Sequence, residues 1–243
     1  MAARIRIDRL LVERGLFASR ARAQAAIAAG RVTANAVTVT RASDEVSADA
    51  MLCAEPAHPY VSRGGVKLAA ALDHFGFDPR GRVCLDVGAS TGGFSEVLLQ
   101  RGARRVYAVD VGRDQLHPSL RLQPDLVSLE GTDIRALDPL QLPEPPNFVT
   151  IDVSFISLKL VLAPTLRFAV RPAHLLALVK PQFEARRASA KKGIVRDLRV
   201  HAAICDDIGA FLVSLGWQVA GVIPSPIRGG DGNREFFIGA FHD

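Results

Sequence analysis

Short apolar runs alternate with segments of helical periodicity along most of the chain, and many of the runs end at a charged residue. The clearest run begins at Val83 and ends in the carboxylate of Asp86; a glycine-rich turn follows, and then Phe94, Val97 and Leu98 at the spacing of one helix face. This order predicts a strand, a tight turn and a helix. Further runs predict strands over 106–109, 126–129, 148–151, 175–179, 217–223 and 235–240.

Helical periodicity fills several of the gaps between these runs, from Val66 to Gly76 and over 201–215. Strands that alternate with helices favour a mainly parallel sheet. We therefore predict an α/β fold with a Rossmann-like, mainly parallel sheet whose last strand is antiparallel.

The first 56 residues have a different pattern and are predicted to form a small α+β domain. A short helix is expected over 7–15, capped near Asp8 and stopped at Gly15. Ser19 is a suitable N-cap for a second helix through Ala29, and short β segments lie around Asn35. We place a proline-broken linker at 57–63 and the larger domain at 64–243.

Charge is concentrated in the small domain. The chain of 243 residues has a net charge of +5, and residues 1–31 hold seven arginines against two acidic residues, so the rest of the chain is balanced. Such clustering is typical of a module that binds a polyanion. No apolar stretch approaches the roughly 18 residues of a membrane span, and no signal peptide is apparent, so we expect a cytoplasmic protein without membrane contact. The three cysteines lack ligand spacing, and neither disulfides nor a metal are expected.

The carboxylate beside the glycine turn indicates which ligand the turn suits. In a dehydrogenase a pyrophosphate would approach here, and Asp86 would repel it. The same carboxylate suits a cation, such as the ammonium and sulfonium groups of S-adenosylmethionine (SAM). Asp110 is expected to accept hydrogen bonds from ribose hydroxyls, and Asp133 from the adenine amino group. A SAM site is therefore predicted on the loop of Gly88, Ala89, Ser90, Thr91, Gly92, Gly93 and Phe94.

Further charged residues are expected at the same edge of the sheet, because ligands bind beyond the carboxyl ends of parallel strands. Asp152 and Lys180 each end a strand. Glu235 joins them if the last strand is antiparallel, and Lys67, on the preceding helix, can reach over the rim. Two lysines and two carboxylates at one edge, beside a SAM loop, favour a catalytic site over surface ion pairs.

Two resemblances extend this interpretation. The pattern Arg9-Leu10-Leu11, Ser19-Arg20, Gly30-Arg31-Val32 and Asn35 resembles the S4 RNA-binding domain, although Ala36 stands where a glycine is usual. The resemblance implies contacts with RNA phosphates. We assign these contacts to Arg4, Arg6, Arg9, Arg14, Arg20, Arg22 and Arg31, and add Arg63 of the following segment.

The larger domain resembles the FtsJ-type 2′-O-ribose methyltransferases, and the whole chain is similar to the TlyA family, also named haemolysin A. Five motifs carry this second resemblance, at 62–68, 86–94, 152–157, 180–184 and 232–237. It implies a Lys-Asp-Lys-Glu tetrad at Lys67, Asp152, Lys180 and Glu235, and ribosomal RNA, with cytidine as the nucleotide, as substrate. The segment 186–193 has less glycine than the family commonly shows.

The residue types also restrict the chemistry. A neutral lysine can take the proton of a ribose hydroxyl where burial and a nearby cation lower its pKa, and we expect Lys180 to be that base, with Lys67 as the cation. Asp152-Val153-Ser154-Phe155 lacks the proline pair typical of enzymes that methylate exocyclic nitrogens, and no cysteine ends a strand as a nucleophile.

Several alternatives stay open. A membrane-active haemolysin and a non-catalytic RNA-binding protein are rival functions. The compact ends of the chain favour the large ribosomal subunit as target, and we expect a monomer.

Overall fold

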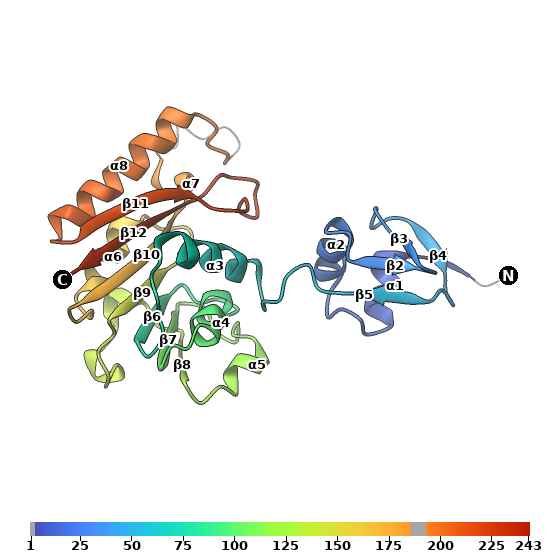
Figure 1. Cartoon of the computed structure of the whole chain (residues 1–243), viewed down its shortest axis with the longest axis horizontal. Helices are drawn as coiled ribbons and strands as arrows, with labels where there is room; N and C mark the ends of the chain where they lie inside the picture. The colour runs from blue at the N-terminus through green and yellow to red at the C-terminus, as the bar shows by residue number, and fades with distance from the viewer. Residues whose placement is uncertain (1–2, 186–192) are drawn as a thin grey trace. The chain divides into compact units, whose positions relative to one another are not determined.

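The computed structural model describes residues 3–185 and 193–243. The chain divides into two compact units, Met1–Pro59 and Tyr60–Asp243 (Figure 1). The second unit thus begins four residues before the predicted position 64. Tyr60 packs against the core of this unit.

The first unit combines two helices with two small antiparallel sheets. One sheet has the order β3-β2-β5 and the other pairs β1 with β4. A small apolar core, including Ile7, Leu11, Ala23 and Ile27, lies between the helices and strands. The elements are β1 (Arg4–Arg6), α1 (Ile7–Glu13), α2 (Arg20–Ala28), β2 (Val32–Ala34), β3 (Val37–Thr38), β4 (Glu45–Ser47) and β5 (Leu52–Ala54).

The helix signals of this unit are largely confirmed. Ser19 caps α2, its side chain accepting from the backbone N–H of Arg22 at 3.4 Å, and Asn35 has the positive φ of a turn residue. The predicted cap at Asp8 is wrong. Helix α1 begins at Ile7 with Arg6 as its N-cap, and Asp8 is buried within the helix.

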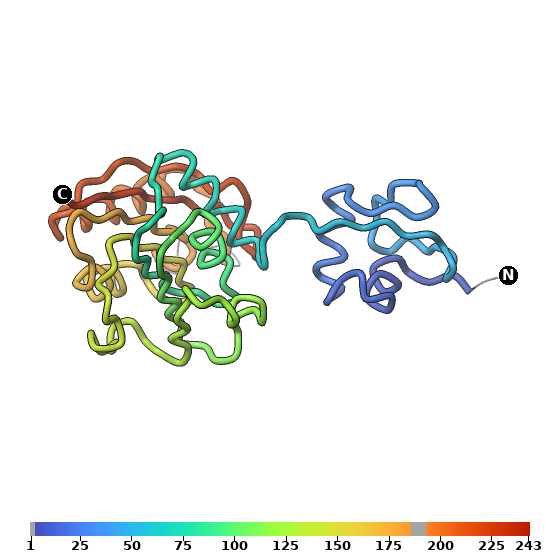
Figure 2. Tube along the Cα trace, turned by 60° about the horizontal axis from the view of Figure 1, so that its bottom comes forward, coloured from blue at the N-terminus to red at the C-terminus, as the bar shows by residue number. Residues whose placement is uncertain are grey.

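The second unit is built on a seven-stranded sheet of order β11-β12-β10-β9-β6-β7-β8. The strands from β10 to β8 are parallel, and β12 is antiparallel to both β10 and β11, which confirms the prediction for the last strand. Both views show the red strands β11 and β12 side by side at one edge (Figures 1 and 2). The strands are β6 (Val83–Val87), β7 (Arg105–Asp110), β8 (Leu126–Glu130), β9 (Phe148–Ile151), β10 (Ala173–Val179), β11 (Gln218–Pro224) and β12 (Phe236–His242).

Helices cover both faces of this sheet. On one face α3 and α4 pack over Cys84, Leu176 and Phe237; on the other α6 and α8 pack over Leu85 and Leu175. Successive residues of a strand thus face opposite layers. The helices are α3 (Arg63–Phe75), α4 (Gly93–Gln100), α5 (Pro118–Arg121), α6 (Leu158–Leu166), α7 (Pro181–Glu184) and α8 (Leu198–Ser214), with 3-10 turns at Ile134–Ala136 and Pro139–Gln141.

Helix α3 begins three residues earlier than the apolar periodicity predicts. Its first turn holds Gly64 and Gly65, and a Cβ on Gly65 would overlap the ring of Tyr60. Close packing against this ring therefore fixes the first turn, which apolar spacing does not reveal. The helix ends as predicted, at Gly76 in the left-handed conformation.

Candidate active site

The alternation along the strands explains why the charged residues meet. Val179 ends β10 facing the α6–α8 layer, so the next residue, Lys180, continues toward the α3–α4 layer. The same step takes the chain from Ile151 to Asp152. Lys67 belongs to α3 in that layer and is buried.

Two ion pairs result. Lys67 Nζ lies 2.5 Å from Glu235 Oε2, and Lys180 Nζ lies 2.6 Å from Asp152 Oδ1. Lys67, Lys180 and Glu235 are exposed by only 7%, 9% and 4%. Such burial of charge is costly unless each group is paired. Each lysine here has a carboxylate partner.

The Lys180–Asp152 contact is an ion pair without the alignment of a hydrogen bond, since Asp152 Oδ1 is buried without a hydrogen-bond partner in the described residues. The hydrogen bond of Lys180 goes instead to Ser154 Oγ, at 2.8 Å. Asp152 Oδ1 therefore keeps acceptor capacity for a further donor.

Two adjoining cavities open at this edge of the sheet. The larger has a volume of about 490 Å³. The smaller, of about 310 Å³, is lined by Arg63, Lys67, Asp152, Lys180 and the glycine loop. The cavities share four lining residues, Gly88, Ser90, Asp152 and Ser154.

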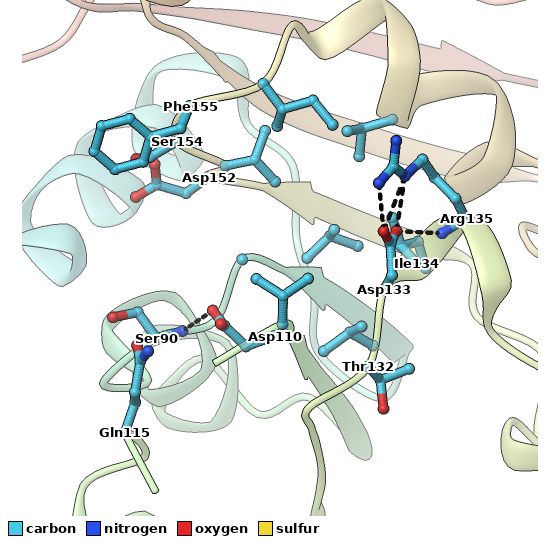
Figure 3. Close-up of a pocket in the computed structure, with 17 residues that line it drawn as sticks. Ser90, Asp110, Gln115, Thr132, Asp133, Ile134, Arg135, Asp152, Ser154 and Phe155 are labelled. Atoms are coloured by element: carbon cyan, nitrogen blue, oxygen red, sulfur yellow. Dashed lines mark hydrogen bonds and ion pairs between the residues drawn. The ribbon is translucent and has the colours of Figure 1, made fainter. Parts of the chain in front are cut away.

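The larger cavity has the composition of a nucleoside site (Figure 3). Asp110, at the end of β7, accepts from the backbone N–H groups of Ser90 at 2.8 Å and Gly112 at 2.7 Å. The remaining acceptor positions of this carboxylate suit a ribose diol. Apolar side chains, among them Val109 and Ile134, suit the faces of a purine.

Asp133 lies in the same cavity but is already engaged. Both carboxylate oxygens accept from the guanidinium of Arg135, and the carboxylate caps the following turn (Figure 3). This pairing lowers the pKa of Asp133. The adenine contact assigned to Asp133 stays a prediction, with Arg135 as a neighbour that the sequence reasoning did not consider.

Six of the seven loop residues assigned to SAM line the cavities. Gly88 has a φ of 85°, and a Cβ there would overlap the carbonyl oxygen of Asp152, so this residue must be glycine. Gly92 is the exception. It lines neither cavity, and a Cβ there would overlap Leu116 and Leu120, so this glycine serves packing of the loop against α5.

Asp86 requires a correction. Its side chain is fully buried and lines neither cavity. It accepts from Ser95 Oγ at 2.6 Å and from Thr150 Oγ1 at 2.9 Å. Burial raises the pKa of Asp86 to about 7. Asp86 thus lies beneath the loop, because the alternation along β6 turns its side chain toward α4 rather than toward either cavity.

Several site residues were missed by the sequence reasoning. Ser154 contacts Lys180, and Glu184 accepts from Ser157 Oγ at 2.5 Å and from the Leu158 N–H at 2.7 Å. The carboxylate of Glu184 thereby joins the segments that follow β9 and β10. Ser154 and Glu184 lie in motifs already noted, but the sequence gives no signal of what their side chains contact.

The two cysteines of the second unit do not suit the role of a nucleophile. Burial raises the pKa of the Cys84 thiol far above its usual range, and raises that of Cys205 to about 11. Cys53 belongs to the first unit. Across residues 3–185 and 193–243, no group of three or more His, Cys, Asp or Glu is placed to hold a metal ion.

The arginines of the first unit have internal partners. Asp8 accepts from Arg6 at 3.2 Å, from Arg20 at 2.7 Å and from Gln24 at 2.8 Å, and Arg14 donates to two backbone carbonyls. The structure therefore gives Arg6, Arg14 and Arg20 an internal role that the sequence did not suggest. Their part in RNA binding stays a prediction.

The other arginines assigned to RNA are differently placed. Arg4 donates to the Glu45 carbonyl, whereas Arg9 and Arg31 pair with exposed carboxylates, which contribute little and can be exchanged for a phosphate. Arg22 is exposed, and Arg63 belongs to the second unit, where it lines the smaller cavity.

Comparison with known proteins agrees with this division. Residues 60–241 match the FtsJ-like methyltransferase family and residues 5–52 match the S4 domain. A Mycobacterium tuberculosis (strain CDC 1551 / Oshkosh) protein named 16S/23S rRNA (cytidine-2′-O)-methyltransferase TlyA is 42% identical over 241 residues, covering 98% of this chain and 90% of its own.

Two further relatives carry another name. Hemolysin A of Brachyspira hyodysenteriae is 35% identical over 234 residues, covering 96% of this chain and 98% of its own. A solved structure from Streptococcus thermophilus, with the provisional name hemolysin, has a TM-score of 0.78 and 39% identity and covers 100% of this chain and 90% of its own. In the part of this chain that the structure describes, no helix is long and apolar enough to cross a membrane.

Proposed function

Because the chain belongs to the FtsJ-like methyltransferase family and carries an S4 domain, we propose that it transfers the methyl group of SAM to a ribose 2′-hydroxyl of ribosomal RNA. The nucleotide we propose is cytidine, as in the name of the Mycobacterium tuberculosis relative. We further propose that the protein acts as a cytoplasmic monomer.

The observation that carries this proposal is the junction of the two cavities. If Asp110 holds the ribose of SAM in the larger cavity, the sulfonium group of SAM would point toward the residues that line both cavities. These residues include Asp152 and Ser154. Lys180 lies at the far side of that junction, in the smaller cavity. Donor and acceptor would therefore meet where a buried amine is available.

The roles of the four charged residues follow from their pairing. SAM, when bound, supplies an electrophilic methyl group. Lys180 takes the proton from the 2′-hydroxyl, and Asp152 holds the resulting ammonium group. Lys67 provides a fixed cation, and the carboxylate of Glu235 balances its charge. Alignment of donor and hydroxyl contributes much of the acceleration, on the order of 7–11 kcal/mol for well-oriented reactants.

RNA recognition is assigned to both units. We propose that Arg9, Arg22 and Arg31 of the first unit contact phosphates and that Arg63 contacts the backbone beside the target nucleotide. Phosphate contacts of this kind position an RNA and make its affinity fall with salt.

Phe155 is the best candidate for contact with the target base. It lines the larger cavity, its side chain is 90% exposed and its φ is 65°, an uncommon conformation that places it over Phe183 with ring centroids 5.0 Å apart. An exposed aromatic pair of this kind suits stacking on an unpaired base.

The experiment uses purified 30S and 50S particles from a strain lacking the gene. Labelled SAM and the full chain are added, and the methylated nucleotide is located by mass spectrometry. We expect a 2′-O-methylcytidine, and we favour the large subunit. Lys180→Ala and Asp152→Ala should lose transfer while still binding SAM, as measured by calorimetry.

The same experiment separates the rival functions. A non-catalytic RNA-binding protein would retain particle binding without any transfer by the wild-type chain. A membrane-active haemolysin would release dye from lipid vesicles, with no methyl mark on either particle. Near wild-type turnover by Lys180→Ala would show that the assigned base is wrong.

A further inference from the structure

The position of the Lys180 amine depends on a side chain outside the four charged residues. Asp152 attracts Nζ from 2.6 Å, but this contact lacks hydrogen-bond alignment. Coulomb attraction depends on distance and does not orient the amine, whereas a hydrogen bond does. Within the described residues that directional contact is made with Ser154 Oγ, at 2.8 Å.

The contact with Ser154 affects the direction of the lone pair on the Lys180 nitrogen. Lys180 can act as a base only in its neutral form, so the ammonium group of the ion pair must first release a proton to solvent; the neutral nitrogen then has two N–H groups and one lone pair. One N–H is directed at Ser154 Oγ, and the other is drawn toward the Asp152 carboxylate. The lone pair then occupies the remaining position, in a side chain that lines the smaller cavity.

The backbone around Ser154 is held on both sides. Before it, the carbonyl of Asp152 packs against Gly88, where no Cβ fits. After it, Phe155 has a φ of 65°, in the left-handed region. Further on, Glu184 accepts from Ser157 and Leu158. The hydroxyl is therefore presented by a braced segment, although its own side chain belongs to an exposed residue.

We propose that Ser154 is a positioning residue that aims the lone pair of Lys180 at the ribose 2′-hydroxyl, an inference that rests on the proposed function. In the step, the 2′ O–H bond breaks and its proton passes to Nζ, which becomes an ammonium group. The oxygen forms its bond to the methyl carbon as the carbon–sulfur bond breaks, and the electron pair of that bond stays on sulfur. Ser154 donates no proton and forms no bond to the substrate.

The test compares Ser154→Ala, Ser154→Thr and Ser128→Ala in the full chain. Ser128 is exposed on the edge strand β8 and provides the same substitution away from the site. Methyl transfer to the responsive ribosomal particle is measured at saturating SAM and RNA, together with the KM for each and the Kd for SAM by calorimetry.

We expect kcat of Ser154→Ala to fall about 10- to 100-fold, the usual cost of a misaligned reactive group. Both KM values and the SAM Kd should stay within about twofold of wild type, far below the tenfold change that corresponds to about 1.4 kcal/mol. Ser154→Thr, which keeps the hydroxyl, should recover most of the rate, and Ser128→Ala should match wild type.

The inference is overturned if Ser154→Ala keeps wild-type kcat, if Thr and Ala lose the rate equally, or if SAM affinity falls with the rate. Each of these results leaves the proposed function intact as long as the wild-type chain methylates RNA and Lys180→Ala does not. Absence of transfer by the wild-type chain would instead remove the proposed function.

Discussion

Replacement of Asp86 by asparagine tests the electrostatics beneath the glycine loop. The carboxyl is fully buried and has Ser95 and Thr150 as hydrogen-bond donors. Burial raises the pKa of Asp86 from 3.8 to about 7, and the nearby Asp152 adds to the effect. Asp86→Asn keeps the shape and removes the charge.

The magnitude follows from proton linkage. Between pH 4 and pH 7 the folded state holds a proton on Asp86 that the unfolded state has released, so stability falls as pH rises through this window. The full difference corresponds to about 4 kcal/mol, at about 1.4 kcal/mol per pKa unit. Between pH 5 and pH 8 alone, the loss in the wild-type chain is about 2–3 kcal/mol.

The assay uses the single tryptophan of the chain. Trp217 is buried in the second unit, so its fluorescence reports the unfolding of that unit. Urea unfolding of wild type and Asp86→Asn is followed from pH 5 to pH 8, and the free energies of unfolding are extrapolated to water. Other titrating groups, such as His174, are common to both proteins and cancel in the difference.

We expect the free energy of unfolding of Asp86→Asn to rise relative to that of wild type as pH rises, by about 2–3 kcal/mol between pH 5 and pH 8. A difference that stays constant with pH would refute the reasoning, because it would mean that Asp86 is ionised in the folded protein, as in the unfolded chain, throughout this range. That result would show that the hydrogen bonds from Ser95 and Thr150 outweigh the effect of burial on the pKa of Asp86.

Two further predictions concern single carboxylates. Asp110→Ala should raise the SAM Kd about 10- to 100-fold by calorimetry, since hydrogen bonds to a charged group contribute about 1.5–3 kcal/mol. Asp110→Asn should lose less SAM affinity. Unchanged affinity in Asp110→Ala would show that Asp110 does not hold SAM. Asp8→Ala should destabilise the first unit by about 1.5–3 kcal/mol, the usual range for hydrogen bonds to a charged group, because Arg6, Arg20 and Gln24 lose their common acceptor. Hydrogen exchange of the α1 and α2 amides measures this effect, and equal protection in wild type and variant would contradict it.

The periodicity of the sequence determined most of the secondary structure. The strand at 148–151 was predicted with the bounds that the structure has, and Ser19 and Gly76 marked a helix start and a helix end correctly. These features depend on local rules of spacing, capping and backbone freedom, which neighbouring residues settle among themselves. Helix α6 was missed, since Pro164 lies inside it and its apolar residues are not confined to one face.

The edge of the sheet that gathers the polar residues could also be predicted, because parallel strands place their carboxyl ends together. The side to which each residue points could not. Asp86 and Asp110 both end strands beside the glycine loop, yet Asp86 is buried under α4 whereas Asp110 faces the larger cavity. Their surroundings come from helices and loops far away in the chain.

The sequence alone thus determined which elements form, their order and the presence of a charged site at one edge of the sheet. Only the tertiary structure decided the partners: Lys67 with Glu235, Lys180 with Asp152 and Ser154, and Asp8 with the arginines of the first unit. The physical reason is that an ion pair or a hydrogen bond requires atoms within about 3 Å of one another. Lys67 and Glu235 are 168 positions apart in the chain, and the packing of α3 against the sheet is what brings them together.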